Sequence, residues 1–193
     1  MSDRLFAASW QAAWTNMLDR AVADVNRLER RALSDPALGG VLQQIVEKYS
    51  VEVARLNTDP KAIAAQPVVE ERYVDDFGDR RLMKIRKLRV TIPFTGEAES
   101  LKIAPSAARV PSHRVEIANN SLTITIADDD NADRDVTAFC QLVQGNLDVL
   151  RREYERDKPQ LEQAVSQAAE RRKAEIAAES DRDSKHHSFT VRH

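Results

Sequence analysis

The residues best suited to do chemistry form a basic run. Six of the ten residues from Arg80 to Arg89 are Lys or Arg and none is acidic: Arg80, Arg81, Lys84, Arg86, Lys87 and Arg89. Such a run could bind phosphates, with an affinity that falls steeply with salt, or an acidic protein partner. It holds no aromatic residue on which a base could stack, and acids between residues 70 and 79 can offset its charge. We therefore favour a solvated strand and keep nucleic-acid and acidic-partner contact as alternatives.

The other titratable residues give little support for catalysis. Cys140 has apolar neighbours on a predicted helix, which indicates a buried thiol instead of a nucleophile. His186, His187 and His193 lie in a polar tail and His113 is isolated, so we expect no metal or proton-transfer site. The sequence has neither common phosphate-loop pattern, no nucleophile elbow and no zinc-protease motif. It predicts no catalytic residue, no cofactor and no metal.

Five aspartates lie close together before a predicted helix: Asp128, Asp129, Asp130, Asp133 and Asp135. A calcium loop needs an acid or amide at its fifth position and glycine at its sixth, but these positions hold Ala132 and Asp133. Acids at the start of a helix instead complement its exposed N–H groups and its dipole. We expect helix capping and strand termination here.

The elements that position these residues begin with an N-terminal helical segment, residues 1–50. Its apolar spacing predicts one long helix over 3–33, a stop at 34–36 and a short helix over 36–49. Five residues of the long apolar stripe form a candidate helix-mediated interface: Trp10, Trp14, Leu18, Val25 and Leu28. The tryptophans fit a core role against the sheet, but the stripe is longer than a small domain covers, so we expect self-association.

Residues 51–130 predict an antiparallel β region of about five strands. Apolar residues alternate on both sides of Asn119-Asn120, and these asparagines tolerate the positive φ of a tight turn, which predicts a hairpin. The apolar phase changes between residues 81 and 94. Because side chains alternate faces along a strand, this change predicts a β-bulge near Arg86-Lys87.

A helical period returns over residues 131–179 and predicts two helices that meet near Lys158-Pro159 as a helical hairpin. Residues 180–193 form a polar tail with a candidate terminal strand at Phe189 and Val191. Together the patterns predict an α+β fold. In it, an antiparallel sheet of about five strands packs against a long N-terminal helix and a C-terminal helical hairpin as one structural unit.

Bulk composition excludes several classes of protein. The 193 residues have a formal net charge of -2, so no global basic field attracts the chain to a polyanion. One cysteine excludes an internal disulfide, and no apolar run approaches the roughly 18 residues that a membrane span needs. The start of the chain does not resemble a secretory signal. We expect a cytoplasmic protein.

One part of the sequence resembles a known type of protein. The block VTIPFTGEAESLKIAPSAARVPSHRVEIANNSLTITIADDD, the helical stretch that starts FCQLVQGNLDVLRREY and the ending SFTVRH carry the resemblance, over about residues 90–193. They resemble a region of uncharacterised bacterial proteins that precedes a restriction-endonuclease-like nuclease domain. The resemblance implies a targeting or assembly module of nuclease-type, phage-defence machinery. It transfers no catalytic residue, because no acid followed by an E-x-K core occurs here.

These observations lead to one functional hypothesis and two alternatives. We expect a non-catalytic assembly module that forms a homo-oligomer through its helices and positions a partner protein, an effector or nuclease subunit. The first alternative is a nucleic-acid-binding accessory protein that uses residues 80–89. The second is a small hydrolase whose site matches no common motif.

Overall fold

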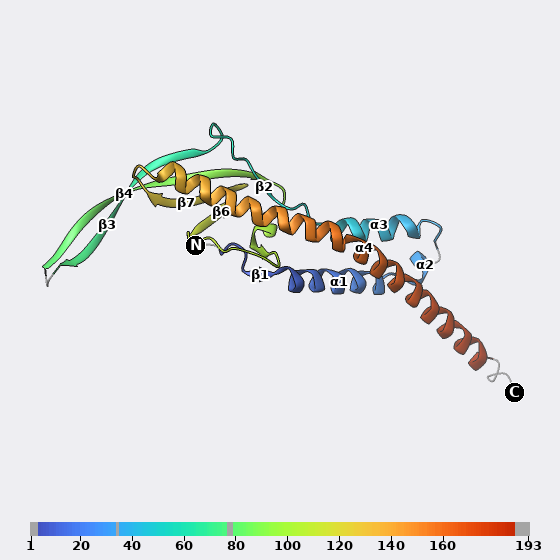
Figure 1. Ribbon diagram of the computed structural model, residues 1–193. Coiled ribbons are helices and arrows are strands. Elements are labelled where there is room, and N and C mark those ends of the chain that lie inside the picture. The colour runs from blue at the N-terminus through green and yellow to red at the C-terminus, as the bar shows by residue number, and fades with distance from the viewer. Residues whose placement is uncertain (1–3, 34, 77–78, 188–193) are drawn as a thin grey trace. The chain divides into compact units, whose positions relative to one another are not determined.

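The computed structural model describes residues 4–33, 35–76 and 79–187 and has an α+β fold (Figure 1). Its elements follow one another in this order: β1 (Ala8–Ser9), α1 (Trp10–Asn26), α2 (Arg30–Leu33), α3 (Leu38–Lys48), β2 (Arg55–Leu56), β3 (Ala64–Asp76), β4 (Asp79–Thr95), η1 (Ala98–Lys102), β5 (Ile103–Ala104), β6 (Val115–Ala118), β7 (Ser121–Ala127) and α4 (Ala132–His187). The predicted α+β class with a five-stranded antiparallel sheet is confirmed, and the longest helix is the C-terminal α4.

The chain divides into two compact units. The sheet unit comprises the residues before Gln11 together with Val51–Glu153. The helical unit comprises Gln11–Ser50 together with the chain after Glu153. Helix α4 contributes residues to both units. No helix in the described ranges combines the length and the apolar character that crossing a membrane requires.

The sheet is built around β4. Its strands follow the order β2-β4-β7-β6, and β3 pairs with β4 as well; all of these pairs are antiparallel. The predicted hairpin is confirmed, because β6 and β7 pair across Asn119 and Asn120, whose φ angles are 50° and 54°. These positive angles match the tight turn that the two asparagines predicted.

The core of the sheet unit lies on one face of the sheet. On β4, alternate residues Val90, Ile92 and Phe94 are buried, and Ile92 is 0% exposed. Their partners on β7 continue the same face, since Val90 pairs with Ile124 and Ile92 pairs with Leu122. Figure 1 shows the first part of α4 lying along this face, and α4 adds a buried stripe: Phe139, Val143, Leu147 and Leu150.

The predicted β-bulge near Arg86-Lys87 is wrong. The register between β3 and β4 is continuous from Ala64↔Thr91 to Asp76↔Asp79, so no extra residue is inserted. The apolar phase changes for another reason. Strand β7 pairs with β4 only from Lys87 to Pro93, so the part of β4 before Lys87 leaves the covered sheet and no longer has one face to bury.

The part of the β3–β4 hairpin beyond β7 is called the arm and consists of residues 69–76 and 79–86. These residues pair only with each other among the described strands. Eight residues per strand at about 3.4 Å each give the arm a length of roughly 27 Å. Figure 1 shows it extending past the end of β7. On the sheet side of the arm, β3 contains Pro67, a residue that edge strands tolerate because its missing N–H can face solvent.

A close approach fixes the end of β4. Gly96 has φ +83°, and a Cβ there would lie 2.9 Å from the carbonyl oxygen of Glu52. Next to it, the Ser100 hydroxyl donates to the carbonyl of Glu97 (2.7 Å) and accepts from the backbone N–H of Ala54 (2.9 Å). Gly96 is therefore required both for its backbone conformation and for the space it leaves.

The prediction of one helix over residues 3–33 is wrong at both ends. Phe6 has φ 53°, and the backbone N–H groups of Phe6 and Ala7 donate to the carbonyls of Leu101 and Lys102. Strand β1 then pairs in parallel with β5. Backbone pairing with the sheet unit thus replaces the start of the helix, and the helix stops at Asn26 before the separate turn α2. Residue 3 and Ser34 lie outside the described residues.

The predicted C-terminal helical hairpin is also wrong, because α4 is one helix of 56 residues with Pro159 inside it. An interior proline removes one hydrogen bond and costs roughly 3 kcal/mol. Tyr154, Leu161 and Val165 lie on one stripe and are all buried. Burying Leu161 and Val165 contributes roughly 1.5–3 kcal/mol each, so continuing the helix offsets the proline. Residues 188–193, with the candidate terminal strand, lie outside the described residues.

The helical unit has its own core, made by α1, α2, α3 and the second part of α4. Its buried residues are Trp14, Ala21, Val25, Leu33, Leu38, Ile45, Tyr49, Tyr154, Leu161, Val165, Ala168 and Ala169. Asp24 links two of its helices, because its Oδ2 accepts from Lys48 Nζ (2.6 Å) and from the Tyr49 hydroxyl (2.7 Å). The hydrogen bonds from Lys48 and Tyr49 hold the pKa of Asp24 below its usual value, and the bond to Asp24 raises the pKa of Lys48.

Candidate functional site

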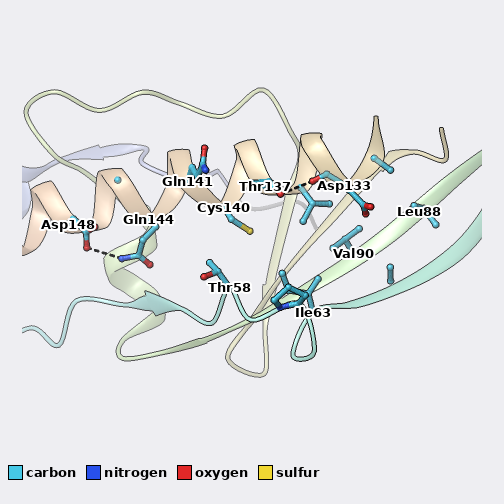
Figure 2. Close-up of a pocket in the computed structure, with 15 residues that line it drawn as sticks. Thr58, Ile63, Leu88, Val90, Asp133, Thr137, Cys140, Gln141, Gln144 and Asp148 are labelled. Atoms are coloured by element: carbon cyan, nitrogen blue, oxygen red, sulfur yellow. Dashed lines mark hydrogen bonds between the residues drawn. The ribbon is translucent and has the colours of Figure 1, made fainter. Parts of the chain in front are cut away.

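A groove lies between α4 and the sheet, within the sheet unit. It has a volume of about 840 Å³, within the range of small-molecule and peptide sites. Ile63, Ala65, Leu88 and Val90 form its apolar side on the strand face, and Thr58 and Pro60 come from the segment before β3. Figure 2 shows Leu88 and Val90 of β4, together with Ile63, facing the stretch of α4 that carries Cys140.

The helix wall of the groove follows one stripe of α4. Its residues recur at three- and four-residue spacing: Ala132, Asp133, Val136, Thr137, Cys140, Gln141, Gln144, Gly145 and Asp148. Thr137, Gln141 and Gly145 are exposed, so the groove is open along its length. A Cβ at Gly145 would meet nothing within 4 Å. Between Asp133 and Asp148 the stripe spans fifteen residue steps, or about 22 Å of helix.

The charged residues that line the groove are two acids, Asp133 and Asp148, and no Lys or Arg lines it. Figure 2 shows them at opposite ends of the lined stretch of α4. Within the described residues, the Asp133 carboxylate makes no ion pair. Asp148 Oδ1 accepts from Gln144 Nε2 and Arg151 Nη1, both at 2.8 Å. Among the described residues, the groove therefore has an apolar centre, an unpaired carboxylate at the Asp133 end and the Asp148–Arg151 ion pair at the other end.

Cys140 lies in the helix wall and its thiol points toward the groove (Figure 2). The residue is buried, and burial raises the pKa of the thiol above its usual value. A thiol with a raised pKa holds less thiolate, which is the nucleophilic form. The environment thus favours the apolar role that the sequence predicted for Cys140.

The arm is the second candidate site, because it carries exposed apolar side chains. On the face that continues the covered side of the sheet, Tyr73 pairs with Leu82, and Val69 lies two pairs further in. Tyr73 is 68% exposed and Leu82 is 47% exposed. Met83 is exposed on the opposite face. An exposed two-stranded ribbon with apolar residues on both faces is a surface suited to contact with another molecule.

The basic run lies on β4, but its side chains do not gather on one face. Lys84 and Arg86 project from one face of the strand, and Lys87 and Arg89 project from the other face. Each has a carboxylate partner: Lys84 with Glu71, Arg86 with Asp128, Lys87 with Glu70 and Arg89 with Glu116. The backbone of Arg80 and Arg81 belongs to β4, and their side chains lie outside the described set.

These four ion pairs are exposed, and exposed pairs contribute little to stability, about 0–1 kcal/mol each. They do lower the net positive charge that the run presents to a polyanion. Contact of the run with nucleic acid or with an acidic partner stays a prediction.

Comparisons with family models, with curated proteins and with solved structures gave no match.

The candidate helix-mediated interface is largely taken up by packing within the chain. Trp10, Trp14 and Val25 are buried, whereas Leu18 and Leu28 are half-buried. Trp14 contacts Tyr154 of α4 edge-on, with ring centroids 6.4 Å apart and an interplanar angle of 80°. Trp14 therefore packs against a helix within the helical unit. An intermolecular interface through these five residues stays a prediction.

The acidic cluster and His113 have local contacts. Asp129 Oδ1 accepts from the backbone N–H of Asn131 (2.8 Å) at the start of α4, and Asp133 and Asp135 lie in the first turn. No group of three potential metal ligands occurs among the described residues. His113 contacts Phe139 edge-on at 5.6 Å. His186 and His187 end α4, and His193 lies outside the described residues.

The groove was not among the sites predicted from the sequence. Its lining comes from three separate stretches, residues 58–65, 88–90 and 132–148, and no local pattern joins them. One signal was present. Gly145 interrupts a strongly periodic helix, where glycine costs about 1 kcal/mol relative to alanine, and no turn or close contact requires it. A glycine of this kind marks a place where the helix backbone is left open.

Proposed function

We propose that this protein is a non-catalytic interaction module that self-associates and positions a partner protein, and that the partner docks on the arm. One observation carries the proposal. In the described part of the chain, five large apolar side chains are exposed, and four of them are on the arm: Val69, Tyr73, Leu82 and Met83. The fifth is Val110.

The form of the arm supports docking of a protein. An isolated two-stranded ribbon is marginally stable in water, and exposed apolar residues on it gain nothing from the fold of this chain. Tyrosine and methionine are enriched at protein interfaces, where they exclude water from a central contact. The free edges of the ribbon also offer backbone groups to a strand of a partner.

Two buried polar residues, Asn146 and Glu153, support a non-catalytic role, because their hydrogen bonds hold the fold together. Asn146 Oδ1 accepts from the backbone N–H of Arg109 (3.1 Å), and Asn146 Nδ2 donates to the Arg109 carbonyl (2.7 Å). Glu153 accepts from the backbone N–H of Ser106 (3.2 Å) and from its hydroxyl. These bonds fix the segment between β5 and β6 against α4, which is a structural task.

The kind of partner follows from the resemblance of residues 90–193 to modules that precede nuclease domains. It supports a separate bacterial effector of nuclease type, in phage defence, as the partner. Self-association is supported by the half-buried Leu18 and Leu28, which still present apolar surface.

Removal of the arm tests the docking site. Residues 71–84 are replaced by Asn-Gly, which joins the paired residues Glu70 and Ile85 by a two-residue turn. The full chain and this variant are used to capture proteins from the native host, followed by mass spectrometry. We expect one protein that the full chain captures and the variant does not.

Point variants distinguish specific binding at the arm from nonspecific binding to exposed apolar residues. Tyr73→Ser with Leu82→Ser should lose the captured protein, whereas Val110→Ser, which removes an equally exposed apolar residue elsewhere, should retain it. Loss in all variants, or in none, contradicts docking on the arm. Light scattering tests self-association: a strict 21.8 kDa monomer at high concentration contradicts that part of the proposal.

A further inference from the structure

We infer that the groove between α4 and the sheet binds an extended apolar peptide segment with a basic residue at each end, supplied by another protein. The inference uses different residues from the arm and does not depend on it. It begins with the shape of the groove. The helix wall runs about 22 Å, and an extended peptide of seven residues spans about 20 Å between its first and last Cα atoms.

The lining determines which side chains the peptide carries. Ile63, Leu88 and Val90 on the strand side face Val136 and Cys140 on the helix side, so the centre of the groove is apolar. Leu88 and Ile63 are only half-buried by the chain itself, so a peptide that covers them removes further apolar surface from water, which stabilises a complex.

The ends of the groove determine the charge of the peptide. Asp133 and Asp148 are the charged lining residues, one at each end, and no base faces them from the lining. Arg151 contacts Asp148 Oδ1, but its Nη2 is directed to the carbonyls of Val53 (3.4 Å) and Ala54 (3.2 Å). A Lys or Arg at the Asp133 end of the peptide complements a carboxylate that is unpaired among the described residues, and one at the other end shares the Asp148 carboxylate with Arg151; an acid at the Asp133 end is repelled.

The open side of the groove favours a peptide over an acyl chain. A peptide backbone needs hydrogen-bond partners, and the exposed rim provides side chains with both donors and acceptors. The Gln141 amide makes no hydrogen bond within the described residues, and it lies beside Thr137 and Gly145 on the rim. At Gly145 a ligand backbone can approach the helix closely, because no Cβ stands there.

The test uses two fluorescein-labelled peptides, KLALALK and ELALALE, and fluorescence anisotropy with the full chain. We expect KLALALK to bind at least about tenfold more tightly than ELALALE, because opposite charges attract and like charges repel across the two ends. Moderate salt should reduce this difference.

Variants locate the binding. Gly145→Leu places a bulky side chain on the helix wall, at a position where a Cβ meets nothing within 4 Å, and should weaken the binding of KLALALK at least about tenfold, whereas Gly145→Ala, the matched control, should bind like the original chain. Asp133→Asn removes a charge that has no ion pair and should weaken binding about two- to five-fold. The arm deletion should leave binding unchanged, so failure of the arm proposal does not affect this result.

Three results overturn the inference. One is that neither peptide binds. Another is equal binding of both peptides, which would mean that the groove takes apolar chains without selecting charge. The third is that a fluorescent fatty acid binds the original chain, fails to bind the Gly145→Leu variant and does not compete with KLALALK. This result would assign the groove to a small amphiphile.

Discussion

Both halves of β4 carry apolar residues, but the surroundings of the two halves differ. In the inner half, Val90, Ile92 and Phe94 alternate on a face that β7 and α4 cover, and they are buried. In the outer half, Leu82 and Met83 are neighbours on opposite faces of a ribbon, and both are about half exposed. The comparison teaches that an apolar residue on a strand is a core residue only where another layer covers its face. Beyond that layer it becomes a contact surface.

The largest expected effect comes from a substitution in the buried inner half of β4. Ile92→Ala should lower the free energy of unfolding by about 2–5 kcal/mol, because it removes buried methyl groups and leaves a cavity. The matched variant in the outer half, Leu82→Ala, should change it by about 0.5 kcal/mol or less. Urea denaturation of both variants measures the difference. Equal losses would show that the arm is covered in solution.

The second effect tests the end of the inner half. Gly96→Ala should destabilise by about 1–3 kcal/mol, because alanine is strained at φ +83° and its Cβ would meet the Glu52 carbonyl. Gly145→Ala, on an open part of α4, should instead stabilise by about 0.5–1 kcal/mol. Thermal unfolding of the two variants should therefore shift in opposite directions. A shift in the same direction contradicts the close approach at Gly96.

A smaller effect is expected from the charge of Asp24. We expect this charge to contribute more to the stability of the helical unit than an exposed ion pair of β4 contributes to the sheet unit. Because the pKa of Asp24 is lowered in the folded state, its carboxylate stabilises the fold. This stabilisation is complete above the ordinary carboxyl pKa and is lost as pH falls through the folded-state pKa. The raised pKa of Lys48 gives the reverse at high pH, where its contribution is lost as pH rises through the folded-state value.

The stability difference between the original chain and Asp24→Asn should therefore shrink as pH falls from neutral to about 2.5 in urea titrations. Glu116→Gln, which breaks an exposed pair with Arg89 on β4, is the control and should show a weaker trend. A difference that is independent of pH would mean that Asp24 contributes through packing alone.

The smallest expected effect concerns the bases. Because Lys84, Arg86, Lys87 and Arg89 are paired and divided between two faces, we expect no measurable binding of labelled DNA or RNA at low or moderate salt. The paired variants Lys84→Gln/Arg86→Gln and Lys87→Gln/Arg89→Gln should behave like the original chain. Salt-dependent binding that either double variant weakens would favour the nucleic-acid alternative.

The sequence predicted best where short-range chemistry decides the structure. The β6–β7 hairpin follows from two asparagines that accept positive φ, and its alternating residues set the register. It failed where distant contacts override local signals. Pro159 indicates a helix end, yet the buried stripe on both sides of it keeps α4 continuous. Phe6 fits a helical stripe, but hydrogen bonds to Leu101 draw its backbone into the sheet unit.

The candidate sites follow the same rule. The basic run was visible, but its carboxylate partners on β3, β6 and the segment after β7 become neighbours only through strand pairing. The phase change in β4 was visible as well. It marked the point where cover ends, and a bulge was the wrong physical explanation because the register passes through it unchanged.

Pro67 lies in β3 at the base of the arm, where it limits the addition of further strands. A long ribbon with bare edges can recruit further strands from identical chains, and each added strand offers a new edge to the next. Proline has no N–H to donate, so a strand that tries to extend inward along β3 meets a gap in the ladder at that position. Sheet growth is thereby discouraged at the base of the arm, which lowers the tendency of this exposed ribbon to form fibres.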